Sequence, residues 1–159
     1  MSDVRYRFMK PDEAVCISEL IITEFDEFIG QEYTPQGIEE FRKYVQPDVL
    51  LERTIQEHFV LVAARASDLI GMIEMRQNNH VALLFVAKRA QGQGVARDLL
   101  HHALAEARSQ MPELERVTVN SSRYGVPAYE KLGFRQTGPE RVVNGIVFIS
   151  MAKRLEGVT

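Results

Sequence analysis

Residues 81–107, VALLFVAKRAQGQGVARDLLHHALAEA, decide the expected fold of this chain. The first six residues are apolar on both faces of a strand, which is typical of a strand in the middle of a covered sheet. Further along, apolar residues recur at helical spacing: Val95, Ala96, Leu99, Leu100, Ala103, Leu104 and Ala107. The chain is therefore predicted to run from a buried strand, through a glycine-containing turn, into an amphipathic helix.

The turn, residues 87–97, has the chemistry of a phosphate site. The start of a helix exposes unpaired backbone N–H groups and a partial positive charge, which bind phosphate where no side chain blocks the backbone. Gly92, Gly94 and Ala96 leave that approach open, and three basic residues surround it, namely Lys88, Arg89 and Arg97. These features predict a polyanionic ligand; the alternative is that the glycines only form the turn.

Two other nucleotide-binding loops are excluded here. No Lys-Ser or Lys-Thr pair follows the glycines, so the loop is not a P-loop. A dinucleotide-binding fingerprint would need a small residue where Arg97 stands, and the preceding strands resemble an antiparallel meander.

The remaining elements are predicted from periodicity and turn residues. We expect strands at 4–9, 59–64, 69–75, 81–86, 116–120 and 146–151, with a further one at 134–137, and helices at 12–30, 35–45, 47–56, 95–107 and 127–132. The runs 59–64, 69–75 and 81–86 are predicted to form the meander.

Composition indicates one globular domain over residues 1–159, with 45% hydrophobic and 26% charged residues. The single cysteine, Cys16, permits no internal disulfide and no multi-cysteine metal site. Acidic residues number 22 and basic ones 19, a net charge of -3, which argues against a nucleic-acid partner. The chain has no run of about 18 apolar residues and no hydrophobic signal core, so we expect a soluble cytoplasmic protein without a membrane partner.

Two motifs resemble those of the GCN5-related N-acetyltransferase (GNAT) superfamily. Residues 91–96, QGQGVA, are similar to its QxxGxA pyrophosphate loop, and residues 129–134, YEKLGF, are similar to its second signature. The predicted order of elements is similar over essentially the whole chain. The resemblance implies an α/β GNAT fold, in which a mixed, mainly antiparallel sheet opens into a V-shaped cofactor cleft flanked by helices.

The resemblance also implies a reaction and its cofactor contacts. It implies transfer of acetyl from acetyl-CoA, without a metal, to a primary amine of a small molecule or peptide by direct attack in a ternary complex. The implied cofactor-binding residues are Leu84, Phe85, Val86, Gln91, Gly92, Gln93, Gly94, Val95, Ala96, Arg97, Asn120 and Ser122. A backbone N–H near Val86 is implied as the oxyanion donor, and Ser122 stands where many relatives have an asparagine.

Three residues are candidates for proton transfer. Tyr129 lies in the second signature and is the candidate general acid for the departing thiolate. His80 lies at the entry to the strand ending at Val86, where relatives often have a carboxylate, and is the first candidate base; otherwise it only terminates the strand. Glu74, an acid within an apolar run, is the second candidate; otherwise it acts through a water relay, or points to solvent from a polar face of the sheet.

Several questions stay open from the sequence alone. The alternatives to an N-acetyltransferase are a non-catalytic acyl-CoA-binding regulatory module and an acyltransferase with another acyl group or acceptor atom. The acceptor site is expected around residues 28–45 and the hairpin loops. Acidic residues there suit either a cationic amine or a solvated helix face: Glu24, Asp26, Glu27, Glu32, Glu39 and Glu40. Family habit makes a homodimer possible.

Overall fold

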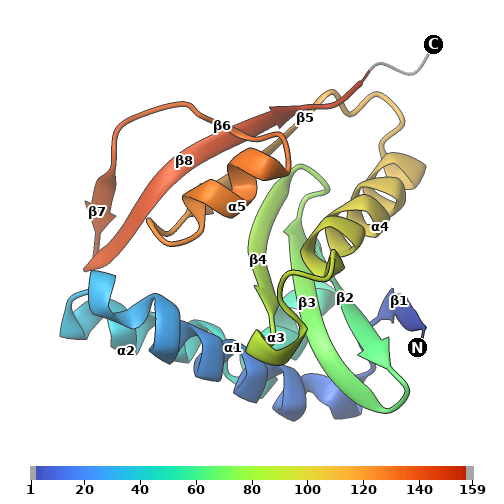
Figure 1. Ribbon diagram of the computed structural model, residues 1–159, viewed down its shortest axis with the longest axis horizontal. Helices are drawn as coiled ribbons and strands as arrows, with labels where there is room; N and C mark the ends of the chain where they lie inside the picture. The colour runs from blue at the N-terminus through green and yellow to red at the C-terminus, as the bar shows by residue number, and fades with distance from the viewer. Residues whose placement is uncertain (1–2, 157–159) are drawn as a thin grey trace.

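The computed structural model describes residues 3–156, and Figure 1 shows its elements. The order is β1 (Val4–Phe8), η1 (Pro11–Glu13), α1 (Ala14–Phe28), η2 (Gly30–Glu32), α2 (Pro35–Tyr44), α3 (Pro47–Ile55), β2 (His58–Arg65), β3 (Asp68–Arg76), β4 (His80–Val86), η3 (Lys88–Ala90), α4 (Val95–Gln110), β5 (Arg116–Ser121), α5 (Val126–Lys131), β6 (Arg135–Gln136), β7 (Arg141–Val143) and β8 (Ile146–Arg154).

One mixed sheet organises the molecule. Its strands lie in the order β1-β2-β3-β4-β5-β8-β6, and β7 pairs with β8 outside this path. Every pairing is antiparallel except that of β4 with β5, which is parallel. The predicted α/β class, the antiparallel meander and the central place of residues 81–86 are therefore confirmed.

The sheet opens between β4 and β5. These strands pair only at His80 with Thr118 and at Val81 with Val119. Beyond Val81 the edge of β4 that faces β5 has no strand partner within residues 3–156, and Figure 1 shows the two halves of the sheet diverging toward α1 and α2. This divergence is the predicted V-shaped opening.

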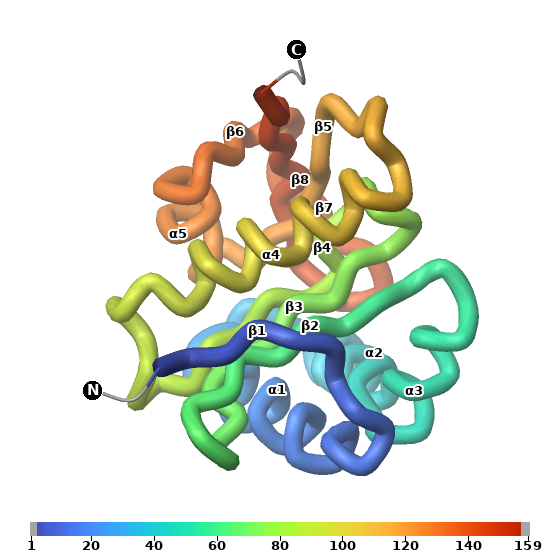
Figure 2. Tube along the Cα trace, turned by 90° about the vertical axis from the view of Figure 1, so that its right-hand side faces the viewer, coloured from blue at the N-terminus to red at the C-terminus, as the bar shows by residue number. Residues whose placement is uncertain are grey.

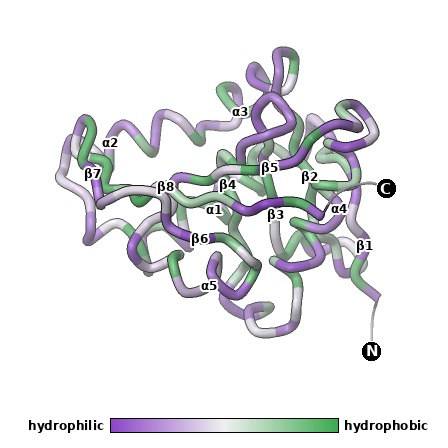
Figure 3. The backbone as a smooth tube through the Cα atoms, turned by 90° about the horizontal axis from the view of Figure 1, so that it is seen from above, coloured by the Kyte–Doolittle hydropathy of each residue, from purple (hydrophilic) through white to green (hydrophobic). Residues whose placement is uncertain are grey.

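Helices cover both faces of the sheet because its central strands are apolar on both sides. Val60 and Val62 of β2 pack into a core with α1, α2 and α3, whereas Leu61 and Ala63 pack into a second core with α4. Figure 2 shows α4 on one side of β1–β3, and α1 and α3 on the other. In Figure 3 hydrophobic residues alternate with hydrophilic ones along α2, as expected for a helix that buries one side.

The strand β7 is absent from the sequence prediction. It forms a hairpin with β8 through Asn144 and Gly145, which both have positive φ, 52° and 78°. An Asn-Gly pair between two β-prone runs is the sequence signal for such a turn. The Gly145 carbonyl accepts a hydrogen bond from the Thr34 N–H at 3.1 Å, so the hairpin is attached to the start of α2.

No helix within residues 3–156 is both long enough and apolar enough to span a bilayer.

Candidate active site

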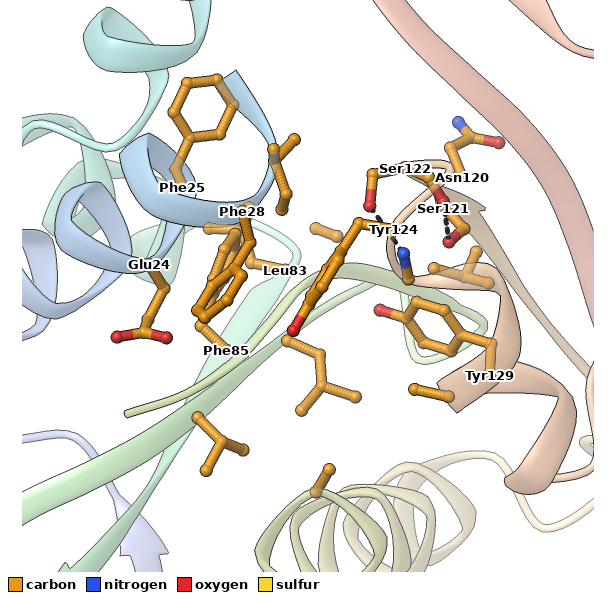
Figure 4. A pocket seen from close by; sticks show the side chains of 18 of the residues that line it. Glu24, Phe25, Phe28, Leu83, Phe85, Asn120, Ser121, Ser122, Tyr124 and Tyr129 are labelled. Atoms are coloured by element: carbon orange, nitrogen blue, oxygen red, sulfur yellow. Dashed lines mark hydrogen bonds between the residues drawn. The ribbon is translucent and has the colours of Figure 1, made fainter. Parts of the chain in front are cut away.

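A cavity of about 670 Å³ occupies the opening between β4 and β5. Its lining on one side comes from α1 and α2, and on the other side from β5, α5 and the β7–β8 hairpin. Between these two sides it is lined by β4 and the start of α4. Figure 4 shows aromatic and aliphatic side chains making most of its wall, with polar groups concentrated at the end of β5. A cavity of this size suits a small ligand together with part of a cofactor.

Backbone N–H groups are available at the glycine loop. Gly94 is the N-cap of α4 with a φ of 83°, and Gly92 has a φ of 76°. A Cβ at Gly92 would meet no atom within 4 Å, so the backbone there borders open space. None of the N–H groups of residues 92–97 donates to an acceptor within residues 3–156. Six successive donors therefore remain for a ligand at the mouth of the cavity.

Glu24 of α1 fixes the glycine loop in place. Its carboxylate accepts hydrogen bonds from the Lys88 N–H at 3.2 Å and from Gln91 Nε2 at 3.1 Å. Gln91 Nε2 also donates to the Val86 carbonyl at 3.0 Å. Burial raises the pKa of Glu24 above its usual value, against the lowering effect of the Lys88 N–H. The signal for this role was an acid on the apolar stripe of residues 14–28.

The structure brings most of the predicted cofactor residues together. The residues that line the cavity are Leu84, Phe85, Val86, Gln91, Gly92, Gly94, Val95, Ala96, Arg97, Asn120 and Ser122. Gln93 does not line it, and its Oε1 accepts a hydrogen bond from Arg65 Nη2 at 2.7 Å.

Two of these residues already have hydrogen-bond partners within the fold. Ser122 Oγ accepts from the Gly125 N–H at 2.9 Å, within the turn that precedes α5. Asn120 Oδ1 accepts from Ser150 Oγ at 3.1 Å. Both side chains nevertheless border the cavity, so the end of β5 and the loop that follows it present polar groups to it.

Tyr129 extends from α5 into the cavity, where Figure 4 shows its hydroxyl pointing away from the helix. Its ring packs edge-on against Phe134 at 5.3 Å between centroids. The hydroxyl has no hydrogen-bond partner within residues 3–156. Burial raises the pKa of the Tyr129 phenol above its ordinary value, so the group carries its proton at neutral pH.

His80 borders the same cavity from the start of β4. Its Nδ1 lies 2.8 Å from Thr118 Oγ1, and that hydroxyl donates to the Asn79 carbonyl at 3.4 Å. The hydroxyl therefore accepts from Nδ1–H, which leaves the lone pair on Nε2. Burial, followed by the charge of Arg76, lowers the pKa of His80 to about 4, so the imidazole is neutral at pH 7. Thr118 could not be predicted as its partner, because the contact depends on the parallel β4–β5 pairing.

The structure places Glu74 neither in the cavity nor at the solvent-exposed surface. Its side chain is completely buried, so it does not point to solvent, and it is not among the residues lining the cavity. Arg53 binds both carboxylate oxygens at 2.7 and 2.9 Å, and His58 Nδ1 lies 2.6 Å from Oε2. The carboxylate is thus held in an ion-pair cluster between β2, β3 and α3.

The acidic residues of α1, η2 and α2 are mostly neutralised within the fold. Asp26 pairs with Arg42, Glu27 with Lys88, and Glu39 with Lys43, while Glu24 and Glu32 accept backbone N–H groups. Glu40 alone among the six has no such partner within residues 3–156, and it lines the cavity.

Two stacked aromatic rings that line the cavity connect α1 with the segment before α5. Phe28 of α1 and Tyr124, which precedes α5, stack with ring centroids 4.8 Å apart (Figure 4). Glu32 reinforces the contact, because its carboxylate accepts the N–H groups of Arg123 and Tyr124 at 2.8 and 3.0 Å. Arg123 itself pairs with Glu140.

Comparison with known proteins agrees with this geometry. Residues 29–155 match the family described as "Acetyltransferase (GNAT) domain". A GCN5-related N-acetyltransferase from Rhodopseudomonas palustris is similar in structure, with a TM-score of 0.82, 18% identity and 98% of each chain covered.

Two further solved structures are similar. The PaiA N-acetyltransferase from Thermoplasma acidophilum, in complex with coenzyme A, has a TM-score of 0.81 at 18% identity, over 96% of this chain and 99% of its own. A spermidine N-acetyltransferase variant from Vibrio cholerae has a TM-score of 0.63 at 20% identity, over 95% and 93%.

Proposed function

The chain belongs to the GNAT acetyltransferase family, and from that premise we propose that it transfers the acetyl group of acetyl-CoA to an amine in a ternary complex. Membership of this family favours an acyltransferase over a non-catalytic binding module. The observation that carries the proposal is the row of N–H groups at residues 92–97 that have no acceptor within residues 3–156, five of whose six residues line the cavity at the start of α4.

These donors fit the diphosphate of coenzyme A. Backbone N–H groups at a helix start attract phosphate through hydrogen bonds and the helix dipole. The edge of β4 beyond Val81 lacks a strand neighbour, so its main-chain groups are available to the pantetheine arm, as in the addition of a strand to a sheet. One N–H on the same edge is our proposed donor to the thioester carbonyl oxygen.

His80 and Tyr129 supply the two proton transfers. The amine nitrogen attacks the thioester carbonyl carbon, a C–N bond forms, and the C–S bond breaks. Nε2 of His80 accepts the proton that the amine loses, since Nδ1 is occupied by Thr118. The Tyr129 hydroxyl donates its proton to the departing sulfur. Glu74 has no part in this scheme, because its carboxylate is buried outside the cavity.

Calorimetry tests the loop directly by comparing acetyl-CoA with S-acetylpantetheine, which lacks the diphosphate. We expect acetyl-CoA to bind and S-acetylpantetheine to bind at least about 100-fold more weakly, the loss expected when several charge-assisted hydrogen bonds are removed. Gly92→Val is expected to weaken acetyl-CoA binding by a similar factor, because its side chain would enter the open space beside the backbone.

Gly133→Val is the matched control, since Gly133 also has a positive φ, 100°, lies outside the cavity, and a Cβ there would meet only the flexible end of Lys153. It should lower stability through the same backbone strain without changing the affinity for acetyl-CoA. Equal affinities for the two thioesters, or equal effects of the two substitutions on affinity, would refute the placement of the diphosphate.

The buried His80 also predicts a pH dependence of stability. The imidazole has a pKa of about 4 in the folded protein and about 6.5 in the unfolded chain. Between these values the unfolded chain binds more protons, so the free energy of unfolding falls as the pH falls from 6.5 to 4, by up to about 3 kcal/mol. Urea denaturation at pH 7 and pH 4 should show a smaller decrease for His80→Gln than for the wild type. An unchanged decrease would mean that His80 is not buried as a neutral imidazole.

A further inference from the structure

An arginine without a partner stands at the end of the cavity away from the glycine loop. The cations that line the cavity are Arg97 at the start of α4 and Arg76 at the end of β3. Arg97 contacts Asp98, whereas the Arg76 guanidinium makes no ion pair or hydrogen bond within residues 3–156. The positive charge of Arg76 is therefore available to a ligand.

The sheet register places Arg76 beside the candidate base. Arg76 and His80 are directly opposite each other on β3 and β4, and such side chains lie on the same face as close neighbours. Burial and then the charge of Arg76 lower the pKa of His80, whereas burial raises the pKa of Tyr44 and the charge of Arg76 opposes that rise; both residues line the cavity. A ligand amine at His80 would thus have a guanidinium within reach.

The nearby carboxylate does not cancel this charge. Glu74 lies two residues before Arg76 on the same strand, but its oxygens are engaged by Arg53 and His58. Arg53 and Arg76 together carry two positive charges against the one negative charge of Glu74. This part of the cavity consequently favours an anionic group.

An apolar wall lies farther along β4 from His80, where Phe85 lines the cavity. Phe41 stacks on Phe25 with centroids 4.1 Å apart and contacts Tyr33 and Phe85 edge-on or tilted, so the four rings form one wall. These residues line the cavity between α2 and β4. A polycation would find few charges here, since five of the six acidic residues near it are engaged.

We propose that the acceptor is a small α-amino acid with an apolar or aromatic side chain. Its amine would face His80, its carboxylate would pair with Arg76, and its side chain would pack against the aromatic wall. The inference rests on the proposed acetyl transfer and adds the class of acceptor. Glu40 also lines the cavity and has no ion-pair or hydrogen-bond partner within residues 3–156. If the acceptor were instead a diamine, the Glu40 carboxylate would bind its second amino group.

The test compares amino acids with the amines formed by removing their carboxylate. Thiol release from acetyl-CoA is measured with phenylalanine against phenethylamine and with leucine against 3-methylbutylamine. We expect kcat/KM to favour each amino acid by about 10- to 100-fold, the range for a charge-assisted hydrogen-bonded pair. Arg76→Gln should reduce this ratio to near one.

Arg5→Gln makes the same chemical change on an exposed arginine of β1, outside the cavity, and should leave the ratio unchanged. A preference for the decarboxylated amines that Glu40→Gln abolishes would overturn the proposal in favour of a cationic acceptor. So would a ratio that Arg76→Gln does not alter.

Binding measurements separate failure of this inference from failure of the acetyltransferase assignment. If neither series is acetylated, phenylalanine is titrated into the protein saturated with coenzyme A. Heat that disappears in Arg76→Gln supports the proposal, and its absence in the wild type overturns it. Failure to bind acetyl-CoA would refute the proposed function itself.

Discussion

Tyr129→Phe is expected to lower kcat by roughly 100- to 10,000-fold while leaving the affinity for acetyl-CoA nearly unchanged. The substitution removes only a hydroxyl that reaches the cavity and has no hydrogen-bond partner in the described part of the chain, so it leaves the packing of the ring on Phe134 intact. Steady-state thiol release gives kcat, and calorimetry gives the affinity for acetyl-CoA.

The raised pKa of Tyr129 determines how kcat should depend on pH. Because burial moves the pKa of the phenol upward from 10, it stays protonated throughout the neutral and mildly alkaline range. The wild type should therefore show no loss of kcat from Tyr129 ionisation below pH 10. A decline of kcat near pH 8 that disappears in Tyr129→Phe would contradict the raised pKa.

Phe134→Leu serves as a control for packing. Phe134 is fully buried against the Tyr129 ring, so shortening it should lower stability and affect kcat much less than removal of the hydroxyl. If the two variants lose kcat equally, Tyr129 acts by packing and not as the proton donor. Full turnover in Tyr129→Phe would remove the residue from the reaction altogether.

The sheet and the glycine loop could be predicted because their signals are local. The apolar run 81–86, the stripe on residues 95–107 and the glycines between them specify strand, turn and helix within one short stretch. The short β7 has no such run of its own, and its pairing depends on the turn at Asn144 and Gly145.

Partnerships across the sheet were not predictable from a single sequence. In the sequence, Glu74 is only a polar residue within the apolar run of β3. Its partner Arg53 lies in α3, 21 residues away in the chain, so the local pattern does not reveal the contact. Thr118 reaches His80 only because β4 and β5 pair in parallel for two residues. The roles of Glu24 and Arg76 likewise depend on contacts that only the folded chain shows. Glu24 accepts hydrogen bonds from the Lys88 N–H and Gln91 Nε2, and the Arg76 guanidinium has no partner within residues 3–156.

The second large effect is on stability, at the ion-pair cluster behind the cavity wall. Arg53→Met is expected to reduce the free energy of unfolding by about 3–5 kcal/mol, because it leaves the fully buried Glu74 carboxylate without its main partner. Arg53 also donates to the Tyr44 carbonyl at 2.6 Å and lies 3.7 Å from the Tyr44 ring centroid, so the end of α2 loses a contact as well. Urea denaturation at pH 7 measures the change.

Two further variants decide whether Glu74 supports the fold or the reaction. Arg53→Met combined with Glu74→Met should recover most of the lost stability, since replacing both members of a buried ion pair by apolar groups of similar size costs little. Under conditions where the protein is fully folded, Glu74→Gln should retain kcat within about threefold, because a carboxylate outside the cavity meets no substrate. If folded Glu74→Gln still binds acetyl-CoA but loses 100-fold or more in kcat, Glu74 takes part in the reaction. That result would also require the cavity wall at Tyr44 to open during turnover, since Tyr44 lines the cavity, whereas Arg53, which stacks on its ring, and Glu74 do not.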